Sequence, residues 1–363
     1  MNRRLIRITA WARGNLFGAW WSTATTLVLG YLILRFGIAF VLWGFVHAVW
    51  AVPHNGPGLP DTGACQRAIG SGACWAVVAE KYRLILFGRY PFAEQWRPAI
   101  SVALFVALYV VSAVRRFWRK ELMLIWAAIL TAIAGLMWGG LFGLRFVPED
   151  QWGGLPITLI LATFGLAFAF PLSILVAIGR RSQALPAVRI LCVLYVELIR
   201  GVPLVALLFM ASVMFPLFLP GGVDVNAMLR AQFAIILFAA AYLAEVVRGG
   251  LQSLPKGQAE AAEALGLGWS QRMLLIILPQ ALRLVIPPLV NTFIGLFKDT
   301  SLVLVVGMFD LLMMGKVALS DPPWVAFSTE IYLALALVYI AFCFAMSKYS
   351  RHLERDLTRI RPR

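Results

Sequence analysis

The sequence is poor in the residue types that soluble enzymes use most. Its 363 residues include three histidines and four cysteines, and only 13% are charged, where about 25% is usual for a soluble domain. It has no Cys-x-x-Cys pair, no Cys/His cluster with metal-ligand spacing and no nucleophile motif. The phosphate-binding motif G-x-x-x-x-G-K-[ST] is also missing. We therefore expect no metal site, no bound cofactor and no enzymatic activity of its own.

Apolar residues dominate what is present. They make up 61% of the chain, and the mean hydropathy is +0.83. Runs of about 20 apolar residues recur, the length that crosses the hydrocarbon core of a bilayer. The first run has no convincing cleavage site and further runs follow it, which argues against a signal peptide. The sequence predicts an all-α, polytopic membrane protein with about eight spans, at 27–50, 98–114, 122–144, 156–178, 190–218, 231–247, 284–307 and 330–347.

The net charge of +15 raises the question of a nucleic-acid partner, but the placement of the charges argues against one. Most of the 32 Lys and Arg residues lie in the N-terminal segment, in alternate connections between spans and in the C-terminal tail. This asymmetry follows the positive-inside rule, by which the cytoplasmic loops of membrane proteins carry an excess of Lys and Arg. It predicts a multi-pass membrane protein, surrounded by lipid, with both termini cytoplasmic and no nucleic-acid partner.

The four cysteines fall into two groups. Cys192 and Cys343 lie in predicted spans, where cysteine acts as a small apolar packing residue. Cys65 and Cys74 lie nine positions apart in a Gly-rich stretch of the predicted outer loop. An oxidising periplasm would permit a disulfide between them, and two free thiols are the alternative.

The chain divides near residue 150. Residues 1–150 combine a cytoplasmic start, three spans and a periplasmic loop at 51–97. Residues 151–350 hold five spans and all the recognisable motifs, including a polar cytoplasmic loop at 254–280, and a basic tail follows at 351–363.

Two spans of the second part carry a glutamate and an arginine three positions apart. They are Glu197 with Arg200, and Glu245 with Arg248. This spacing places both side chains on one helix face, and an ion pair lowers the cost of a charge at membrane depth. Each pair is either a local device that permits burial or part of a moving element. Pro203 predicts a kink or break soon after Arg200.

The loop at 254–280 contains a short helix of unusual composition. Residues 259–265, AEAAEAL, are strong helix formers, and the acids Glu260 and Glu263 suit the positive end of a helix dipole. Two glycines then predict a helix end and a sharp turn. Such a helix either docks on another protein or is an ordinary amphipathic connector. The residues concerned are Glu260, Ala261, Ala262, Glu263, Ala264, Leu265, Gly266 and Gly268.

The same loop carries a resemblance to a known family. Glu260-Ala261-Ala262, Gly266, and Ile276 with Leu278-Pro279 match the EAA loop of ABC importer permeases at every spacing. YVELIRGVPL (195–204), AYLAEVVRGGLQSLPKGQ (241–258) and NTFIGLFKDTSLV (291–303) resemble segments of polar amino-acid permeases of the histidine/glutamine class. The additional N-terminal spans are similar to those of the longer permease of general L-amino-acid transporters.

The resemblance implies a location in the bacterial inner membrane and the type I ABC importer fold, with five core helices in each of two permease subunits. It implies a second permease, in a heterodimer or a homodimer, and a cytoplasmic ATPase dimer that holds ATP and Mg²⁺. A periplasmic binding protein would deliver L-amino acids, which cross by alternating access. The loop residues would couple this chain to the ATPase.

Polar residues interrupt the seventh span and suggest a substrate pathway. Asn291 and Lys298 are seven positions apart and share a helix face, and Thr292 and Asp299 adjoin them. Where relatives that prefer basic substrates tend to have an acid after the asparagine, this chain has Thr292, which fits broad or neutral and acidic selectivity. Lys298 and Asp299 could equally be a structural pair, and one subunit of such importers can lack a substrate site.

A stand-alone secondary transporter or channel is the alternative function. Such proteins usually contain two similar halves with broken helices, and the two halves of this chain differ. Neither that alternative nor a membrane enzyme requires a polar docking helix at 259–265.

Overall fold

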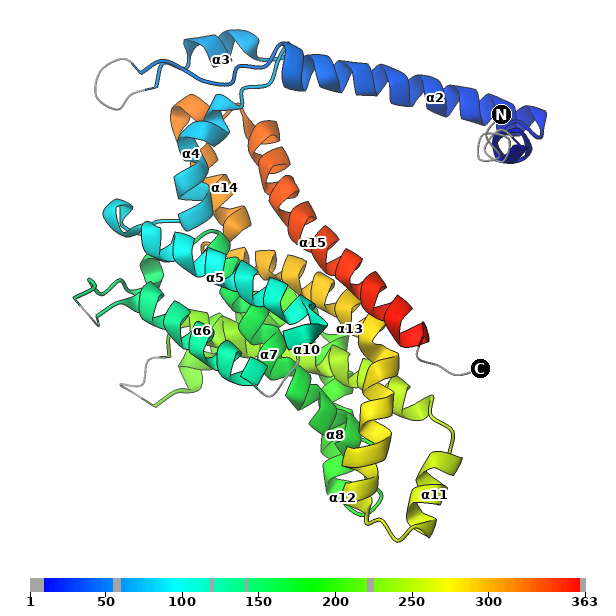
Figure 1. The fold of residues 1–363 in the computed structure, drawn as a ribbon. Helices are drawn as coiled ribbons and strands as arrows, with labels where there is room; N and C mark the ends of the chain where they lie inside the picture. The colour runs from blue at the N-terminus through cyan, green and yellow to red at the C-terminus, as the bar shows by residue number, and fades with distance from the viewer. Residues whose placement is uncertain (1–9, 55–59, 118–120, 141–142, 221–224, 360–363) are drawn as a thin grey trace. The chain divides into compact units, whose positions relative to one another are not determined.

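The computed structural model describes residues 10–54, 60–117, 121–140, 143–220 and 225–359 (Figure 1). The N-terminal arginines at positions 3, 4 and 7, residues 55–59 of the expected periplasmic loop and the last four residues of the basic tail lie outside them.

The chain forms two compact units, Met1–Glu80 with Asp321–Ile331, and Lys81–Ser320 with Tyr332–Arg363. These units do not follow the division expected near residue 150. The reason is that α5 (Trp96–Ala113) and α6 (Glu121–Trp138), which precede that point, pack in the same unit as the helices that follow it.

Eight membrane spans were expected, and the structure supports this number. Seven helical segments of the described chain are long and apolar enough to cross a bilayer, and a bent helix pair makes an eighth. Apart from α5 and α6, the spanning helices are α2 (Trp20–Val41), α7 (Leu155–Gly179), α10 (Ala227–Gln252), α13 (Leu278–Asp299) and α15 (Ser328–Arg359). The shorter ones are α3 (Gly63–Ala68), α4 (Ala76–Phe87), α8 (Pro186–Gly201), α9 (Leu204–Phe209), α11 (Gly257–Ala264), α12 (Trp269–Gln271) and α14 (Leu311–Leu319).

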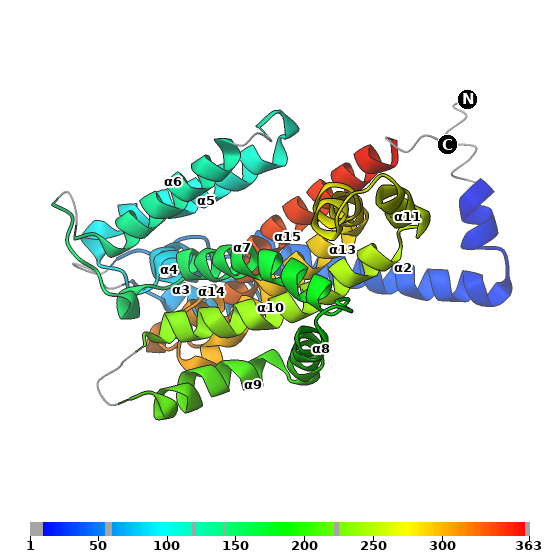
Figure 2. The ribbon, with the colours of Figure 1, turned by 90° about the horizontal axis from the view of Figure 1, so that it is seen from below.

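The bent pair joins α8 to the segment Leu204–Phe218, which begins with α9, at an angle of 104° (Figure 2). Val202 is extended and Pro203 follows it. A proline disfavours helical backbone at the preceding residue and supplies no N–H of its own. The predicted break after Arg200 is confirmed.

The first unit is held together by contacts around the expected outer loop. Cys65 and Cys74 form a disulfide with a Cα–Cα distance of 5.4 Å. The backbone N–H of Cys74 donates to the carboxylate of Glu330 at 2.9 Å, and the indole N–H of Trp75 donates to the carbonyl of Gly44 at 2.6 Å. Helix α2 has no buried residue, which suits a helix surrounded by lipid.

The core of the second unit is the packing of α7 against α10. Buried alanines line α10 from Ala231 to Ala244, and small side chains let helices approach closely in a membrane. A Cβ atom at Gly165 of α7 would lie 2.9 Å from Ile235 of α10. At the same contact, the amide of Gln232 donates to the carbonyl of Leu161.

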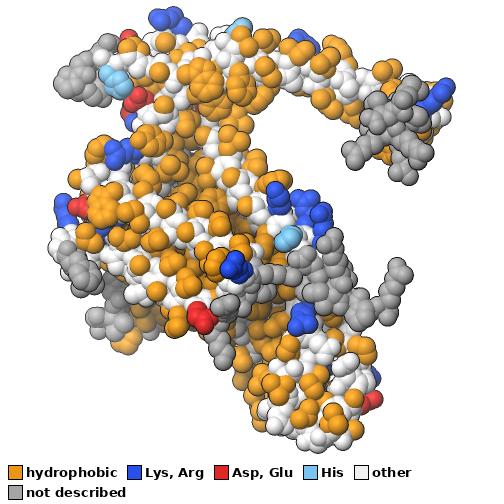
Figure 3. All heavy atoms as spheres, in the orientation of Figure 1, with side chains coloured by type: hydrophobic (Ala, Val, Ile, Leu, Met, Phe, Trp, Pro, Cys, Tyr) orange, Lys and Arg blue, Asp and Glu red, His pale blue; other side chains and the backbone are white. Residues whose placement is uncertain are grey.

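Polar contacts fix α5 and α6 to this core. The Arg97 guanidinium is fully buried and donates to the carbonyls of Leu136 at 2.6 Å and Arg145 at 2.8 Å. The hydroxyl of Tyr109 on α5 hydrogen-bonds that of Thr163 on α7. Hydrophobic side chains cover most of the face in Figure 3, as expected where lipid is the solvent.

The connection between α13 and α15 is anchored by a buried carboxylate. Asp310 is the N-cap of α14, and its oxygens accept from the N–H groups of Leu312 at 3.2 Å and Met313 at 2.9 Å. Burial raises the pKa of the Asp310 carboxyl to about 6, against the lowering effect of these two hydrogen bonds.

We expect neighbouring glycines of α10 to differ in their tolerance of a methyl group. A Cβ at Gly250 would collide with Val285 and lie 2.9 Å from the carbonyl oxygen of Ala281, whereas one at Gly249 meets nothing within 4 Å. Gly250→Ala should lower the free energy of unfolding by about 1–3 kcal/mol through overpacking. Gly249→Ala is the control and should be neutral or gain up to about 1 kcal/mol from helix propensity. Thermal unfolding in detergent would measure both, and equal midpoints would contradict the prediction.

The raised pKa of Asp310 predicts a pH dependence of stability. The folded protein holds this proton more tightly than the unfolded chain, whose carboxyl has its ordinary pKa of 3.8. Stability should therefore be greatest below that value and fall as the pH rises to about 6, by about 2–3 kcal/mol at most.

Asp310→Asn keeps an N-capping oxygen and removes the titration, so the unfolding midpoint between pH 4 and 7 should change less with pH than in the unmodified chain. Asp150→Asn, at an exposed side chain, is the control. Parallel pH profiles for all three proteins would contradict the assignment.

Candidate functional site

Helix α11, within the loop at 254–280, presents nearly all of its surface to solvent. Of its residues only Ala262 is buried, while Glu260, Ala261, Glu263 and Ala264 are exposed. Just beyond it, Leu265 is 78% exposed. A small helix with one buried alanine and an exposed leucine at its end has the form of a docking element.

Two interlocking hydrogen bonds end this helix. The N–H of Gly266 donates to the carbonyl of Glu263 at 2.9 Å, and that of Leu267 to the carbonyl of Ala262 at 3.2 Å. This is a Schellman motif, which requires a left-handed residue, and Gly266 has φ +76°. Gly268 was expected to share this role, but its φ is −65° and it caps α12 instead.

The two acids of α11 have different surroundings. Glu263 was expected in the first helical turn, but α11 begins at Gly257, so only Glu260 lies there. Glu263 instead forms an ion pair with Arg272, at 2.6 Å. The side chain of Glu260 makes no hydrogen bond or ion pair with any residue in the described part of the chain.

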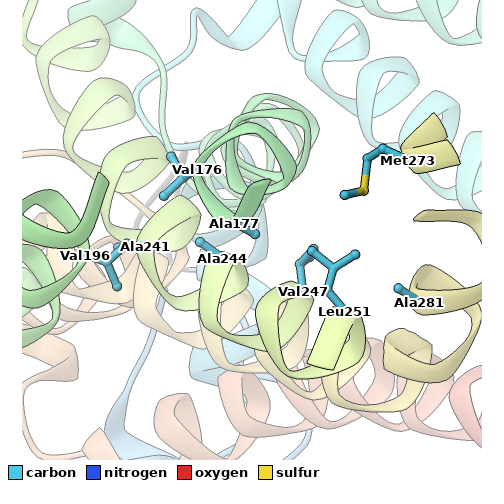
Figure 4. Close-up of a cluster of buried hydrophobic side chains, with 9 residues drawn as sticks. All are labelled: Val176, Ala177, Val196, Ala241, Ala244, Val247, Leu251, Met273 and Ala281. Carbon is cyan, nitrogen blue, oxygen red and sulfur yellow. The ribbon is translucent and has the colours of Figure 1, made fainter. Parts of the chain in front are cut away.

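The loop is rooted in a buried apolar cluster (Figure 4). Leu251 precedes the loop, Met273 lies within it after α11, and Ala281 follows it. These residues pack with buried side chains of α7, α8 and α10, so the loop is joined to three helices. The cluster consists of Val176, Ala177, Val196, Ala241, Ala244, Val247, Leu251, Met273 and Ala281.

A group of charged residues adjoins this cluster, with Glu245 of α10 at its centre. The Glu245 carboxylate pairs with Arg180, with Arg248 at 2.7 Å and with Arg200 at 3.7 Å. Arg180 also reaches Glu197 at 2.9 Å. Three helices, α7, α8 and α10, thus meet through three arginines and two glutamates.

The expected Glu245–Arg248 pair is present, whereas the expected pairing of Glu197 with Arg200 is wrong. Glu197 turns to Arg180 and Arg200 to Glu245, because the end of α7 brings a third guanidinium between α8 and α10. Only one feature of the sequence pointed to Arg180: it is an arginine directly after the apolar run of α7.

The four residues suggested for a substrate pathway lie along α13. Asn291 and Lys298 are exposed on one face, as their spacing predicts. The hydroxyl of Thr292 donates to the carbonyl of Pro288 at 3.1 Å, within the helix. No ion pair joins Lys298 to Asp299, although both lie in described parts of the chain. No group of three metal-ligating side chains occurs among the residues described.

Comparison with known proteins identifies the family. The model of binding-protein-dependent transport system inner membrane components matches residues 169–359. YhdY, an inner membrane amino-acid ABC transporter permease protein of Escherichia coli (strain K12), is 46% identical over 96% of this chain and 93% of its own length. The chain belongs to this family of transport components. Family members are membrane subunits of transporters and not enzymes, and they act with ATPase and binding-protein partners.

Other relatives agree with this membership of the transport family. The permease protein BztC of the glutamate/glutamine/aspartate/asparagine transport system of Rhodobacter capsulatus is 36% identical over 96% of this chain and 93% of its own. The crystal structure of an amino acid ABC transporter with histidines matches at a TM-score of 0.50 and 29% identity, over 56% of this chain and 92% of the other. The expected ABC importer fold and multi-pass inner-membrane location are confirmed for this family member.

The Schellman motif predicts the effect of replacing Gly266. Proline cannot adopt a φ of +76° and has no N–H to donate to Glu263, so Gly266→Pro should disorder the end of α11. ATP-dependent transport should fall by at least about tenfold while membrane insertion continues. Gly257→Ala, at the start of α11 where a Cβ atom meets nothing within 4 Å, is the matched control and should transport normally. Normal uptake by the Gly266→Pro variant would contradict a role for this loop in transport.

Because Glu245 pairs with three arginines and Glu197 with one, we expect replacement of Glu245 to destabilise the protein more. Glu245→Gln leaves three arginines with one compensating glutamate and should lower the free energy of unfolding by up to about 3–5 kcal/mol. Glu197→Gln, at a side chain that is 62% exposed with one partner, should cost less than about 1 kcal/mol. Thermal unfolding of the purified variants would compare them. Equal losses would mean that Glu245 is not the centre of the group.

Proposed function

We propose that this chain is a membrane-spanning permease subunit of an ATP-binding cassette importer for L-amino acids. A periplasmic binding protein would deliver the amino acid, and a separate cytoplasmic ATPase dimer would drive its passage by alternating access. The amino-acid class is supported by YhdY and BztC, which match nearly the whole chain. ATP and Mg²⁺ would be held by the ATPase.

The observation that carries the proposal is the geometry of α11. An exposed, alanine-rich helix with a fixed end projects from a buried cluster that joins three spanning helices. Residues 260–266 and 268 would dock in a cleft of the ATPase. Closure of the ATPase dimer would then move α11 and, through the buried cluster, the inner ends of α7, α8 and α10.

A second permease would complete the translocation pathway, in a heterodimer or a homodimer. We propose that residues 151–350 form the permease core, which lines one half of the pathway. Residues 1–150 would be an N-terminal extension of that core. Asn291 and Lys298 are exposed on one face of α13, which supports a position facing a cavity or the partner permease. With Thr292 and Asp299, they are our candidates for contact with the passing amino acid.

The orientation that we propose places both termini and α11 in the cytoplasm. The basic residues beside α7 and around α11 favour that side. The disulfide between Cys65 and Cys74 suits the opposite, periplasmic side, where such bonds persist.

The proposal is tested by co-expressing the chain with the products of its neighbouring genes and purifying through a C-terminal tag. We expect a P-loop ATPase and a second permease to co-purify. The complex in proteoliposomes should take up L-amino acids only with the binding protein and ATP, and Gly266→Pro should abolish this uptake. A homo-oligomer that transports along an ion gradient without an ATPase would overturn the importer and favour a secondary transporter.

A further inference from the structure

A second feature of the larger unit lies at the helix ends opposite to α11. A pocket of about 520 Å³ opens there, between connections that are far apart in the sequence. Arg89 follows α4, Glu149 and Asp150 precede α7, Asn226 precedes α10, and Phe309 follows the long helical run of α13. All of these residues belong to the same compact unit.

The described residues that line the pocket include side chains of both charge signs that form no ion pair with one another. The guanidinium of Arg89 lies over the ring of Phe309, 5.1 Å from its centroid. Among the described residues, no ion pair links Arg89 to Glu149 or Asp150. Asp150 is exposed, and Glu149 accepts a hydrogen bond from the indole N–H of Trp138 at 2.8 Å.

The positive side of the pocket has further hydrogen-bond donors. The side-chain oxygen of Asn226 accepts from the N–H of Met228 at 2.7 Å, which leaves its amide group as a donor. The first turn of the 26-residue helix α10 begins at the same place, and a helix N-terminus favours negative charge. Apolar walls come from Trp152, Ile157 and Met308.

We propose that this pocket binds the zwitterionic head of an α-amino acid before it enters the membrane pathway. Arg89 and the Asn226 amide would bind the carboxylate, and Asp150 and Glu149 would bind the ammonium group. A pocket with separated charges of both signs suits a dipolar ligand better than a simple anion or cation. The apolar walls would receive the side chain. The inference rests on the proposed function as an amino-acid importer.

The proposal gives the N-terminal extension a function. Arg89, Glu149 and Asp150 all precede the five-helix core, whereas Asn226 and Phe309 belong to it. A permease that consists of the core alone would lack every charged group of this pocket. The extension would therefore contribute to substrate capture on the periplasmic side.

The test uses the complete importer in proteoliposomes with its binding protein. The probe is whichever common L-amino acid the unmodified complex imports fastest. Arg89→Ala and Asp150→Asn should each lower the uptake rate by about tenfold, as expected for loss of a charge-assisted hydrogen bond. Arg145→Ala, at an exposed arginine outside the pocket, is the matched control. Gel filtration confirms that each complex is assembled, and Arg89→Lys, which keeps the charge, should retain more uptake than Arg89→Ala.

Two further measurements separate a zwitterion site from a docking site for the binding protein. The concentration of binding protein that half-saturates ATPase stimulation should not change in Arg89→Ala. The amide of the probe amino acid, which lacks the carboxylate, should inhibit uptake less well than the free amino acid in the unmodified complex, and Arg89→Ala should reduce this difference.

Each other outcome overturns the assignment. A shifted half-saturation would mean that the pocket contacts the binding protein. Uptake by Arg89→Ala equal to that of Arg145→Ala would exclude the pocket while leaving the importer intact. If the unmodified complex imports no L-amino acid, the proposed function fails, and this inference fails with it.

Discussion

The need to compensate charge near the ends of α7, α8 and α10 organises the part of the protein that carries the loop with α11. Glu245 is surrounded by Arg180, Arg200 and Arg248, and an uncompensated charge in such a position is expensive. The ion pairs of Glu245 with Arg180 and Arg200 hold the ends of α7 and α8 against α10. The buried apolar cluster beside the group contains both ends of the loop that carries α11. Charge compensation and the proposed coupling to the ATPase therefore involve the same three helices.

Features that depend on local sequence were predictable. The apolar runs predicted eight spans, and Pro203 predicted the break between α8 and α9. The alanine-rich stretch at 259–265 predicted α11 to within about two residues at each end. Each of these follows from hydrophobicity, from the missing proline N–H or from helix propensity over a few neighbouring positions. The Arg180–Glu245 pair could not be predicted, because it joins residues 65 positions apart and depends on how α7 crosses α10. For the same reason the compact units cross the division near residue 150.

The glycines show the same limit at single positions. Gly266 and Gly268 look alike in the sequence, yet only Gly266 has a left-handed backbone. Gly249 and Gly250 are adjacent, yet only at Gly250 would an added Cβ atom collide with α13. In each pair, one glycine is required by the structure and the other is not. Only the backbone conformation, or the helix packed against the position, shows which of the two is required. The charged pocket was missed for a related reason, since its residues come from four separate connections.

The charged pocket and the loop that carries α11 lie at opposite ends of the same helices, an arrangement that would connect the proposed capture of substrate with the proposed coupling. Helix α10 begins beside Asn226 in the charged pocket and ends at Gln252, where the loop with α11 begins. Its 26 residues span about 39 Å at 1.5 Å per residue, enough to cross a bilayer. The helical run that contains α13 starts after α11 and ends at Val306, on the pocket wall. A tilt of these two helices would therefore move the walls of the pocket and α11 together. Since Glu245 lies two turns before the end of α10, its arginines would resist or permit that tilt, which makes the charged group the natural place for control of the transport cycle.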